Sequence, residues 1–417
     1  MGHFSDLSIT IGECRIRPEG ADERRVCSNC FGDPHLKSEI ERQADSHACD
    51  FCGANWEAVQ AAPLEGVVEY ILQQIEIEYA SADQSLPNDP ETKERMFPED
   101  EFDTAELLEN HIGLELPNDD GALMCHLVET LPEQDWCLLN PLGTQEDEAI
   151  SNSWDAFKQV IKHRRRFFFL AHGDRALEHD ITWGEAAYEI PELLERIATF
   201  AMAHGMLTTM PAGTAWIRCQ ELGEAESGFG ARRMGPPPYD RATLPNRMSP
   251  AGVPMFYGAE TRQTALAEVA ENSGRFAAGR FAVQRDAIVF DVRTAPPVPS
   301  LFDPEHARDR SVAMFMHSFI ADFRAPIDRK RLPHIDYLPT QIITEYFRTM
   351  VLVDDAPVDG IVYASTKDGG KAVVLFAENE DVVDDDEEAD GLHDPWLAMT
   401  DYEELTFDID TGVIAQC

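Results

Sequence analysis

Two pairs of cysteines near the N-terminus constrain the fold of this chain more than any other feature. Cys27 and Cys30 form one C-x2-C pair, Cys49 and Cys52 form another, and 18 residues separate the pairs. A glycine follows the second thiol of each pair by one or two residues, which suits a knuckle turn. Four thiolates at this spacing are typical of one tetrahedral zinc ion with no open coordination position. The sequence therefore predicts a structural zinc site in residues 1–60, rather than disulfides or a redox pair. Two histidines between the pairs are the alternative ligands: His35 and His47.

The charge of the chain limits its partners. The 417 residues include 77 acidic and 34 basic ones, which gives a formal net charge of −43. Such a surface repels nucleic acids and anionic membranes, so a general nucleic-acid binder is not expected. The sequence shows no N-terminal apolar signal region and no apolar stretch of about 18 residues. We therefore expect a cytoplasmic protein that is not held at a membrane.

Residues 61–210 are expected to form a helical domain. Apolar residues recur there at intervals of three and four, which is typical of amphipathic helices. One such stripe comprises Leu64, Val67, Val68, Ile71, Leu72 and Ile75. The same pattern returns around Trp154 and again after Pro191, where the proline suits a helix start.

The stretch Asn246–Val269 carries the residues with the clearest chemical meaning. Prolines and a glycine before Met255 predict a turn, so Met255 to Tyr257 is expected to be a strand. A short helix is expected over Thr264 to Ala270, with Thr261 or Thr264 as its N-cap. This order places Glu268 on a helix behind the strand that carries Tyr257.

The same stretch resembles the RES domain, a family that forms the toxin half of bacterial toxin-antitoxin pairs. The residues that carry the resemblance are Arg247, Tyr257, Glu268 and Ser365, together with a Pro-Thr-Gln block at 339–341. The resemblance implies an α+β fold of the ADP-ribosyltransferase type over residues 211–380. An acidic loop and a C-terminal extension would then occupy residues 381–417. The paired cysteines are similar to those before HEPN-like domains that are fused to RES domains.

The family destroys NAD, and the residue types in this chain suit that chemistry. A guanidinium binds a pyrophosphate with two hydrogen bonds, which favours Arg247 as the phosphate ligand. Arg218 lies where the family has another arginine on its first strand, although a solvated strand arginine is the alternative. A tyrosine face can stack on the flat cationic nicotinamide, so Tyr257 is assigned to that ring, and Ser249 is grouped with it in NAD binding.

The remaining two residues are assigned to bond cleavage. Breaking the bond between nicotinamide and ribose develops oxocarbenium character, which a carboxylate stabilises. Glu268 is the candidate for this role, and Ser365 is expected to orient it or the nicotinamide amide by hydrogen bonding. We therefore expect an NAD glycohydrolase or phosphorylase, with NAD as substrate and zinc as a structural ion.

Other functions remain open at this stage. Arg166 and His172 have the spacing of the HEPN ribonuclease motif, which predicts an RNA-cleaving alternative. A protein ADP-ribosyltransferase and a non-catalytic sensor of an ADP-ribosyl ligand are further alternatives. A neutralising or regulatory protein and a second copy of the chain are the partner candidates. The N-terminal half could itself regulate the RES-like domain.

Overall fold

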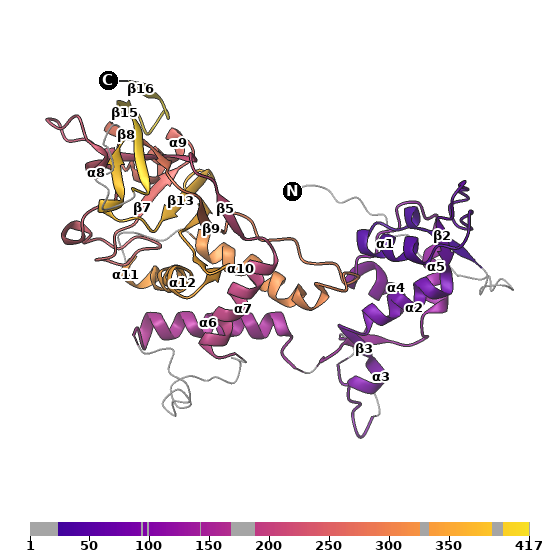
Figure 1. Cartoon of the computed structure of the whole chain (residues 1–417). Coiled ribbons are helices and arrows are strands. Elements are labelled where there is room, and N and C mark those ends of the chain that lie inside the picture. The colour runs from indigo at the N-terminus through magenta and orange to yellow at the C-terminus, as the bar shows by residue number, and fades with distance from the viewer. Residues whose placement is uncertain are drawn as a thin grey trace. The chain divides into compact units, whose positions relative to one another are not determined.

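The structure is a computed structural model, and it divides the chain into two compact units. It describes residues 24–92, 95–97, 100–141, 143–167, 188–325, 333–385 and 395–416. Unit 1 comprises Met1–Gln145 and Pro299–Arg310, and unit 2 comprises Glu146–Val298 and Ser311–Cys417 (Figure 1). Helices and sheets occur together, which confirms the predicted α+β class. No helix in these described ranges combines the length and the apolar composition needed to span a bilayer.

Unit 1 consists of short helices and two small antiparallel sheets. Strand β1 pairs with β2, and β3 pairs with β4. Asp33 caps helix α1 by accepting hydrogen bonds from the backbone N–H groups of His35 and Leu36. The elements of unit 1 are β1 (Arg25–Cys27), a 3-10 turn (Ser28–Cys30), α1 (Pro34–Gln43), β2 (Ala61–Pro63), α2 (Leu64–Ile75), β3 (Tyr79–Ser81), α3 (Ala82–Ser85), α4 (Thr104–Glu106), a π-helical turn (Leu107–His111), α5 (Ala122–Thr130) and β4 (Trp136–Leu138).

The predicted apolar stripe on α2 forms part of the core of unit 1. Leu64, Val67, Ile71 and Ile75 are all buried on this helix. Burying side chains of this size removes apolar surface from water, at roughly 1.5–3 kcal/mol each. The stripe therefore stabilises both the helix and the unit that surrounds it.

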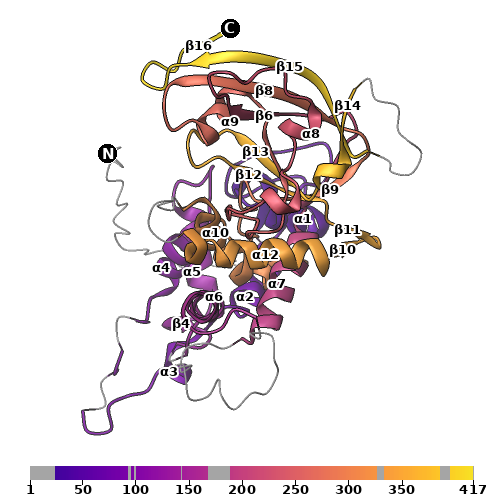
Figure 2. The same ribbon diagram turned by 90° about the vertical axis from the view of Figure 1, so that its left-hand side faces the viewer.

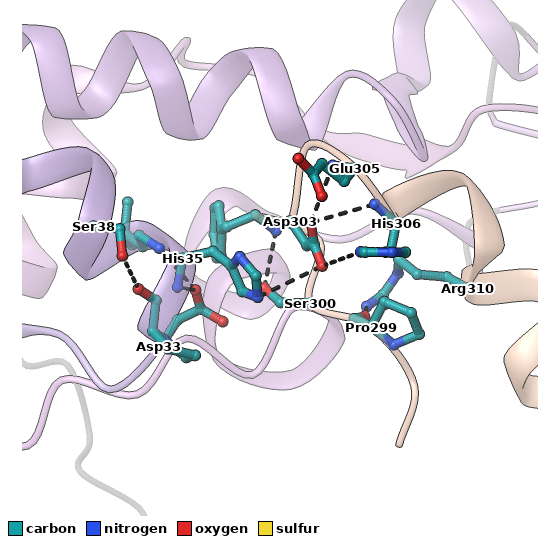
Figure 3. A network of polar contacts seen from close by, with 12 residues as sticks. Asp33, His35, Ser38, Pro299, Ser300, Asp303, Glu305, His306 and Arg310 are labelled. Atoms are coloured by element: carbon teal, nitrogen blue, oxygen red, sulfur yellow. Dashed lines mark hydrogen bonds and ion pairs between the residues drawn. The ribbon is translucent and has the colours of Figure 1, made fainter. Parts of the chain in front are cut away.

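Residues 299–310 belong to unit 1, although unit 2 precedes and follows them in the sequence. Leu301 and Phe302 are buried within the core of unit 1. The hydroxyl of Tyr70 on α2 donates to the backbone carbonyl of Phe302 at 2.9 Å. Figure 3 shows the polar contacts around Asp303 and Arg310 that accompany this docking.

Unit 2 is built on a ten-stranded mixed sheet. Its strand order is β14-β15-β8-β6-β7-β13-β12-β9-β5, and β16 pairs with β15. The strands are β5 (Leu207–Met210), β6 (Ala215–Glu221), β7 (Phe256–Ala259), β8 (Gly274–Val283), β9 (Ala287–Asp291), β12 (Gly360–Ala364), β13 (Lys371–Leu375), β14 (Val382–Asp384), β15 (Leu397–Phe407) and β16 (Ile414–Gln416). A separate hairpin pairs β10 (Leu352–Val353) with β11 (Ala356–Pro357).

Helices cover the part of this sheet that contains β9 and β12, as Figure 2 shows. The shared core includes Phe290 of β9, which stacks on Phe347 with ring centroids 4.0 Å apart. The helices of unit 2 are α6 (Glu146–His163), α7 (Ile190–Ala203), α8 (Ala231–Met234), α9 (Arg262–Val269), α10 (Arg310–Arg324), α11 (Pro333–Asp336) and α12 (Leu338–Thr349), and α10 begins on the last residue of unit 1.

The local structure of Asn246–Val269 agrees with the sequence prediction. Strand β7 carries Tyr257, and α9 carries Glu268. Thr261 is the N-cap of α9, because its hydroxyl accepts the backbone N–H of Thr264 at 3.2 Å. The predicted strand followed by a short helix is therefore confirmed.

Candidate active site

A cavity in unit 2 gathers most of the residues singled out from the sequence. Its volume is about 720 Å³, within the usual range of small-molecule sites. Strands β6 and β7, helix α9 and the loop after β12 contribute to its walls. Its charged lining residues are Arg218, Arg247, Lys367, Glu268 and Glu271. Basic side chains outnumber acidic ones there, so the cavity suits a ligand that carries negative charge.

Arg218 projects from β6 into this cavity. One terminal nitrogen of its guanidinium donates to the backbone carbonyl of Tyr257 at 3.0 Å. Its Nε is buried and finds no hydrogen-bond partner within the described ranges of the chain. Burial lowers the pKa of Arg218 to about 10, so the group still carries its charge at neutral pH. A buried N–H of a charged group is an energetic liability until a ligand accepts it.

Arg247 also lines the cavity, but its guanidinium has structural partners. Its two terminal nitrogens donate to the backbone carbonyls of Phe323 at 2.8 Å and Ala325 at 2.9 Å. These carbonyls end helix α10, where a positive charge is favourable. Arg247 therefore fixes the end of α10 while it keeps a positive charge at the cavity wall.

The Pro-Thr-Gln block at the start of α12 holds the turn that carries Arg247. The amide nitrogen of Gln341 donates to the backbone carbonyls of Asn246 at 2.7 Å and Ser249 at 3.2 Å. The hydroxyl of Thr340 donates to the carbonyl of Arg247. The block thus has a positioning role that its distance in sequence from Arg247 did not reveal.

Tyr257 reaches the cavity from the middle of the sheet, where β7 pairs with β13. Its hydroxyl lies 3.0 Å from the hydroxyl of Ser249, which is buried and does not line the cavity. Burial raises the pKa of Tyr257 to about 12, so its phenol stays neutral over the physiological range. Ser249 therefore contacts the tyrosine and has no place in the cavity lining.

Glu268 and Ser365 form a direct hydrogen bond. The hydroxyl of Ser365 donates to Oε1 of Glu268 at 2.6 Å. Glu268 lines the cavity, whereas Ser365 is 4% exposed and lies behind the carboxylate. The bond is charge-assisted when Glu268 is ionised, and such bonds are the stronger class. Two residues that are 97 positions apart are therefore joined at the cavity wall.

Four cavity residues were missed by the sequence analysis. Tyr337 and Tyr363 add aromatic surface, and Lys367 and Glu271 add charge. Lys367 follows Ser365 by two residues, so its place in the same loop was a usable signal. Tyr363 precedes Ser365 by two residues and Glu271 follows Glu268 by three, so both carried the same kind of signal. Tyr337 begins the block that runs to Gln341, but its approach to the cavity depends on tertiary packing.

The four cysteines of unit 1 come together as predicted. The Sγ atom of Cys30 lies 3.7 Å from the Sγ atom of Cys27 and 3.7 Å from that of Cys49. The Sγ atoms of Cys27 and Cys52 lie 3.6 Å apart. All four ligand atoms lie within 4.8 Å of one another. A tetrahedral ion with metal–sulfur bonds of about 2.3 Å places its sulfurs about 3.8 Å apart. The cluster therefore has the dimensions and the donor set of a metal site.

The HEPN-type pair remains untested. Arg166 lies just after helix α6, and His172 lies outside the residues that the structure describes. No geometry therefore relates the two side chains.

The protein is therefore an α+β protein with a cavity of small-molecule size in unit 2. Residues 215–408 match the family model of the RES domain, and residues 42–175 match that of HEPN/RES N-terminal domain 1. The chain therefore contains a RES domain and, before it, an HEPN/RES N-terminal domain. At the family level, a RES domain supports an NAD-related, toxin-like enzyme domain. No curated protein matches the chain.

Proposed function

We propose that the chain cleaves the bond between nicotinamide and ribose of NAD, as a glycohydrolase or a phosphorylase. The observation that carries the proposal is the carboxylate of Glu268, held by Ser365 in the wall of a cavity that also presents a buried arginine. A RES domain spans this cavity, which makes NAD the substrate to consider first.

In this reaction the bond from ribose C1′ to the nicotinamide nitrogen breaks, and its electron pair neutralises the pyridinium ring. Positive charge develops on the ribose, and the carboxylate of Glu268 stabilises it more in the transition state than in the ground state. An acceptor oxygen then bonds to C1′. Water gives ADP-ribose and a proton, whereas phosphate gives a phosphorylated ADP-ribose.

The other cavity residues suit the binding of NAD. Arg218 and Arg247 add positive charge at the wall for the pyrophosphate. Tyr257 is a flat surface for the nicotinamide ring, a contact worth roughly 0.5–2 kcal/mol. Ser249 supports this tyrosine through its hydroxyl.

The metal that the four cysteines hold is, in our proposal, zinc. Four thiolates favour zinc or an iron–sulfur cluster, and two C-x2-C pairs around one centre favour zinc. Because four protein ligands leave no open position, the ion would stabilise unit 1 and take no part in the reaction.

We further propose that the chain is a toxin or defence effector, restrained by a regulatory protein or by its own N-terminal half. A second copy of the chain is a further partner candidate. These roles rest on the proposed NAD cleavage.

The test is NAD loss over time by the purified full-length chain, with product identification in phosphate and phosphate-free buffers. We expect nicotinamide release, and the second product identifies water or phosphate as the acceptor. ADP-ribose attached to protein would instead show a transferase. Tight NAD binding without any product would replace the enzyme with a sensor.

A further inference from the structure

The loop between β12 and β13 meets helix α9 at two points. Thr264 and Glu268 are four residues apart, so they lie on the same face of the helix, one turn from each other. Thr264 contacts Asp368, and Glu268 contacts Ser365. The loop therefore runs along one face of α9. The bond between Glu268 and Ser365 is its inner contact, at the cavity, and the bond between Thr264 and Asp368 is its outer contact.

The outer contact involves a buried threonine. Thr264 is 3% exposed, and its hydroxyl donates to Oδ2 of Asp368 at 2.9 Å. The same hydroxyl lies 2.9 Å from that of the N-cap residue Thr261. The start of the helix is thus tied to the carboxylate of Asp368, which does not line the cavity.

Asp368 also closes the loop on itself. Its Oδ1 accepts the backbone N–H of Gly370 at 2.9 Å, and the N–H of Ser365 donates to the carbonyl of Gly370 at 2.8 Å. Gly369 has a φ of +76°, a conformation that favours glycine. These bonds fix the backbone of Ser365.

Close packing leaves no room for a side chain at position 370. A Cβ atom there would lie 2.1 Å from the hydroxyl oxygen of Thr264. The loop and the helix start are therefore in direct contact beside the bond between Thr264 and Asp368.

We propose that Asp368, acting through Thr264, is a positioning residue that holds the hydroxyl of Ser365 on Glu268. This inference rests on the proposed function, because it assigns a role in the same reaction. Without the outer contact, Ser365 and the carboxylate lose their fixed separation. A misplacement of about 1 Å can reduce a rate by about 100-fold.

The experiment compares full-length variants in steady-state NAD cleavage. We expect Asp368→Ala and Thr264→Val to lower kcat by about 10- to 100-fold and to change KM by less than about threefold. Thr264→Ser retains the hydroxyl and is expected to restore kcat to within about threefold of the wild-type value. The matched control is Asp408→Ala, because Asp408 also closes a turn, through the N–H groups of Asp410 and Thr411.

A double-mutant cycle separates positioning from general destabilisation. If Asp368 acts through Ser365, Asp368→Ala adds little to the loss caused by Ser365→Ala. Fully additive losses, or an unchanged kcat in Asp368→Ala, would overturn the inference.

Hydrogen exchange tests the same inference without substrate. Amides of residues 365–370 should exchange faster in Asp368→Ala, at least tenfold, while those of the control variant stay as in the wild type. Unchanged exchange would contradict the positioning role. Faster exchange in a chain that cleaves no NAD would instead reject the proposed function and leave the loop contact in place.

Discussion

Arg218 is a buried, charged residue at the cavity wall, and we predict that it contacts the ligand. Its guanidinium is charged, its Nε is buried without a partner within the described ranges, and burial lowers its pKa to about 10. Such a group is expected to destabilise the free protein, because its hydrogen bond to the carbonyl of Tyr257 offsets the desolvation only in part. An anionic ligand would offset this desolvation cost.

Replacing Arg218 should therefore have opposite effects with and without ligand. We expect Arg218→Met to raise the melting temperature of the free protein, because it removes a desolvated charge. ADP-ribose at 100 times its Kd should stabilise the wild type by about 2.7 kcal/mol and therefore raise its melting temperature. It should have little effect on the variant. Thermal unfolding measures both effects.

Arg280→Met is the matched control, because Arg280 is an exposed arginine on the neighbouring strand β8. It should leave the ligand-induced shift intact. An equal shift in Arg218→Met and the wild type would contradict a ligand contact at Arg218.

Two variants separate the role of the Tyr257 ring from that of its hydroxyl. Tyr257→Phe retains the ring and removes the hydroxyl that contacts Ser249. We expect it to keep NAD affinity within about threefold, whereas Tyr257→Ala should weaken binding by about 2- to 30-fold, the range for a lost aromatic contact. Titration calorimetry with NAD measures this, and equal losses in both variants would contradict stacking.

Much of the candidate site could be located from the sequence. Arg247, Tyr257 and Glu268 were singled out by their resemblance to the RES domain, and all three line the cavity. Their roles in binding and catalysis stay predictions. The partners of Arg247 could not be foreseen, because the carbonyls of Phe323 and Ala325 are 76 and 78 positions away.

At the scale of elements, the segment Pro299–Arg310 links the two units through the chain itself. Asp303 accepts the backbone N–H of Glu305 at 3.0 Å, and its Oδ2 lies 2.9 Å from Nδ1 of His306. Nε2 of His35 on α1 lies 3.5 Å from the same oxygen (Figure 3). Helix α10 begins at Arg310, the last residue of this segment, and Arg247 binds the carbonyls at its other end.

The stabilisation that Asp303 and His306 give to the segment Pro299–Arg310 should depend on pH. The hydrogen bond to Asp303 raises the pKa of His306, so its stabilisation is present below about pH 6.5 and is lost as the pH rises through the raised value. Burial raises the pKa of Asp303, but hydrogen bonds from His306 and from backbone N–H groups outweigh this and lower it. The contribution of Asp303 is therefore lost only as the pH falls through that lowered value, below about 4.

We expect Asp303→Asn to destabilise unit 1 more at pH 5.5 than at pH 8.5. The difference in unfolding free energy between wild type and variant, measured by calorimetry at both values, cancels groups that titrate equally in the two proteins. His306 is well exposed, so the pH dependence should be small. A difference that does not change with pH would rule out the ionic contact.

The elements differ in how far the sequence could predict them. The strand and helix around Tyr257 and Glu268 followed from local turn residues and a cap. The burial of Leu301 and Phe302 could not be predicted, because a short irregular segment reveals nothing about the distant core that receives it.

At the scale of the whole molecule, the two units have separate cores. The cysteine cluster lies in unit 1, and the cavity lies in unit 2. Removal of the proposed zinc should therefore affect unit 1 first.

We expect one zinc ion per chain by elemental analysis. A chelator should lower the unfolding temperature of unit 1 selectively, because structural zinc contributes on the order of 10–16 kcal/mol to small domains. Calorimetry with and without chelator should show one shifted and one unshifted transition. Cys125→Ser is the control, since Cys125 lies outside the cluster. A metal-free chain with an unchanged unfolding profile would contradict the structural role.

The net charge of −43 and the basic lining of the cavity complement each other. The surface repels polyanions, while Arg218, Arg247 and Lys367 concentrate positive charge at one point. The composition predicted no general nucleic-acid binding, but only the folded chain shows that these three basic residues lie around one cavity.

The most direct test of the account is the rate of nicotinamide release by Glu268→Gln, with NAD affinity measured in parallel. The account predicts a loss in kcat of at least about 100-fold and a change in affinity below about threefold, because the carboxylate acts on charge that develops in the transition state. Glu260→Gln, which removes a nearby carboxylate outside the cavity, should retain the wild-type rate. A wild-type rate in Glu268→Gln would contradict the central claim.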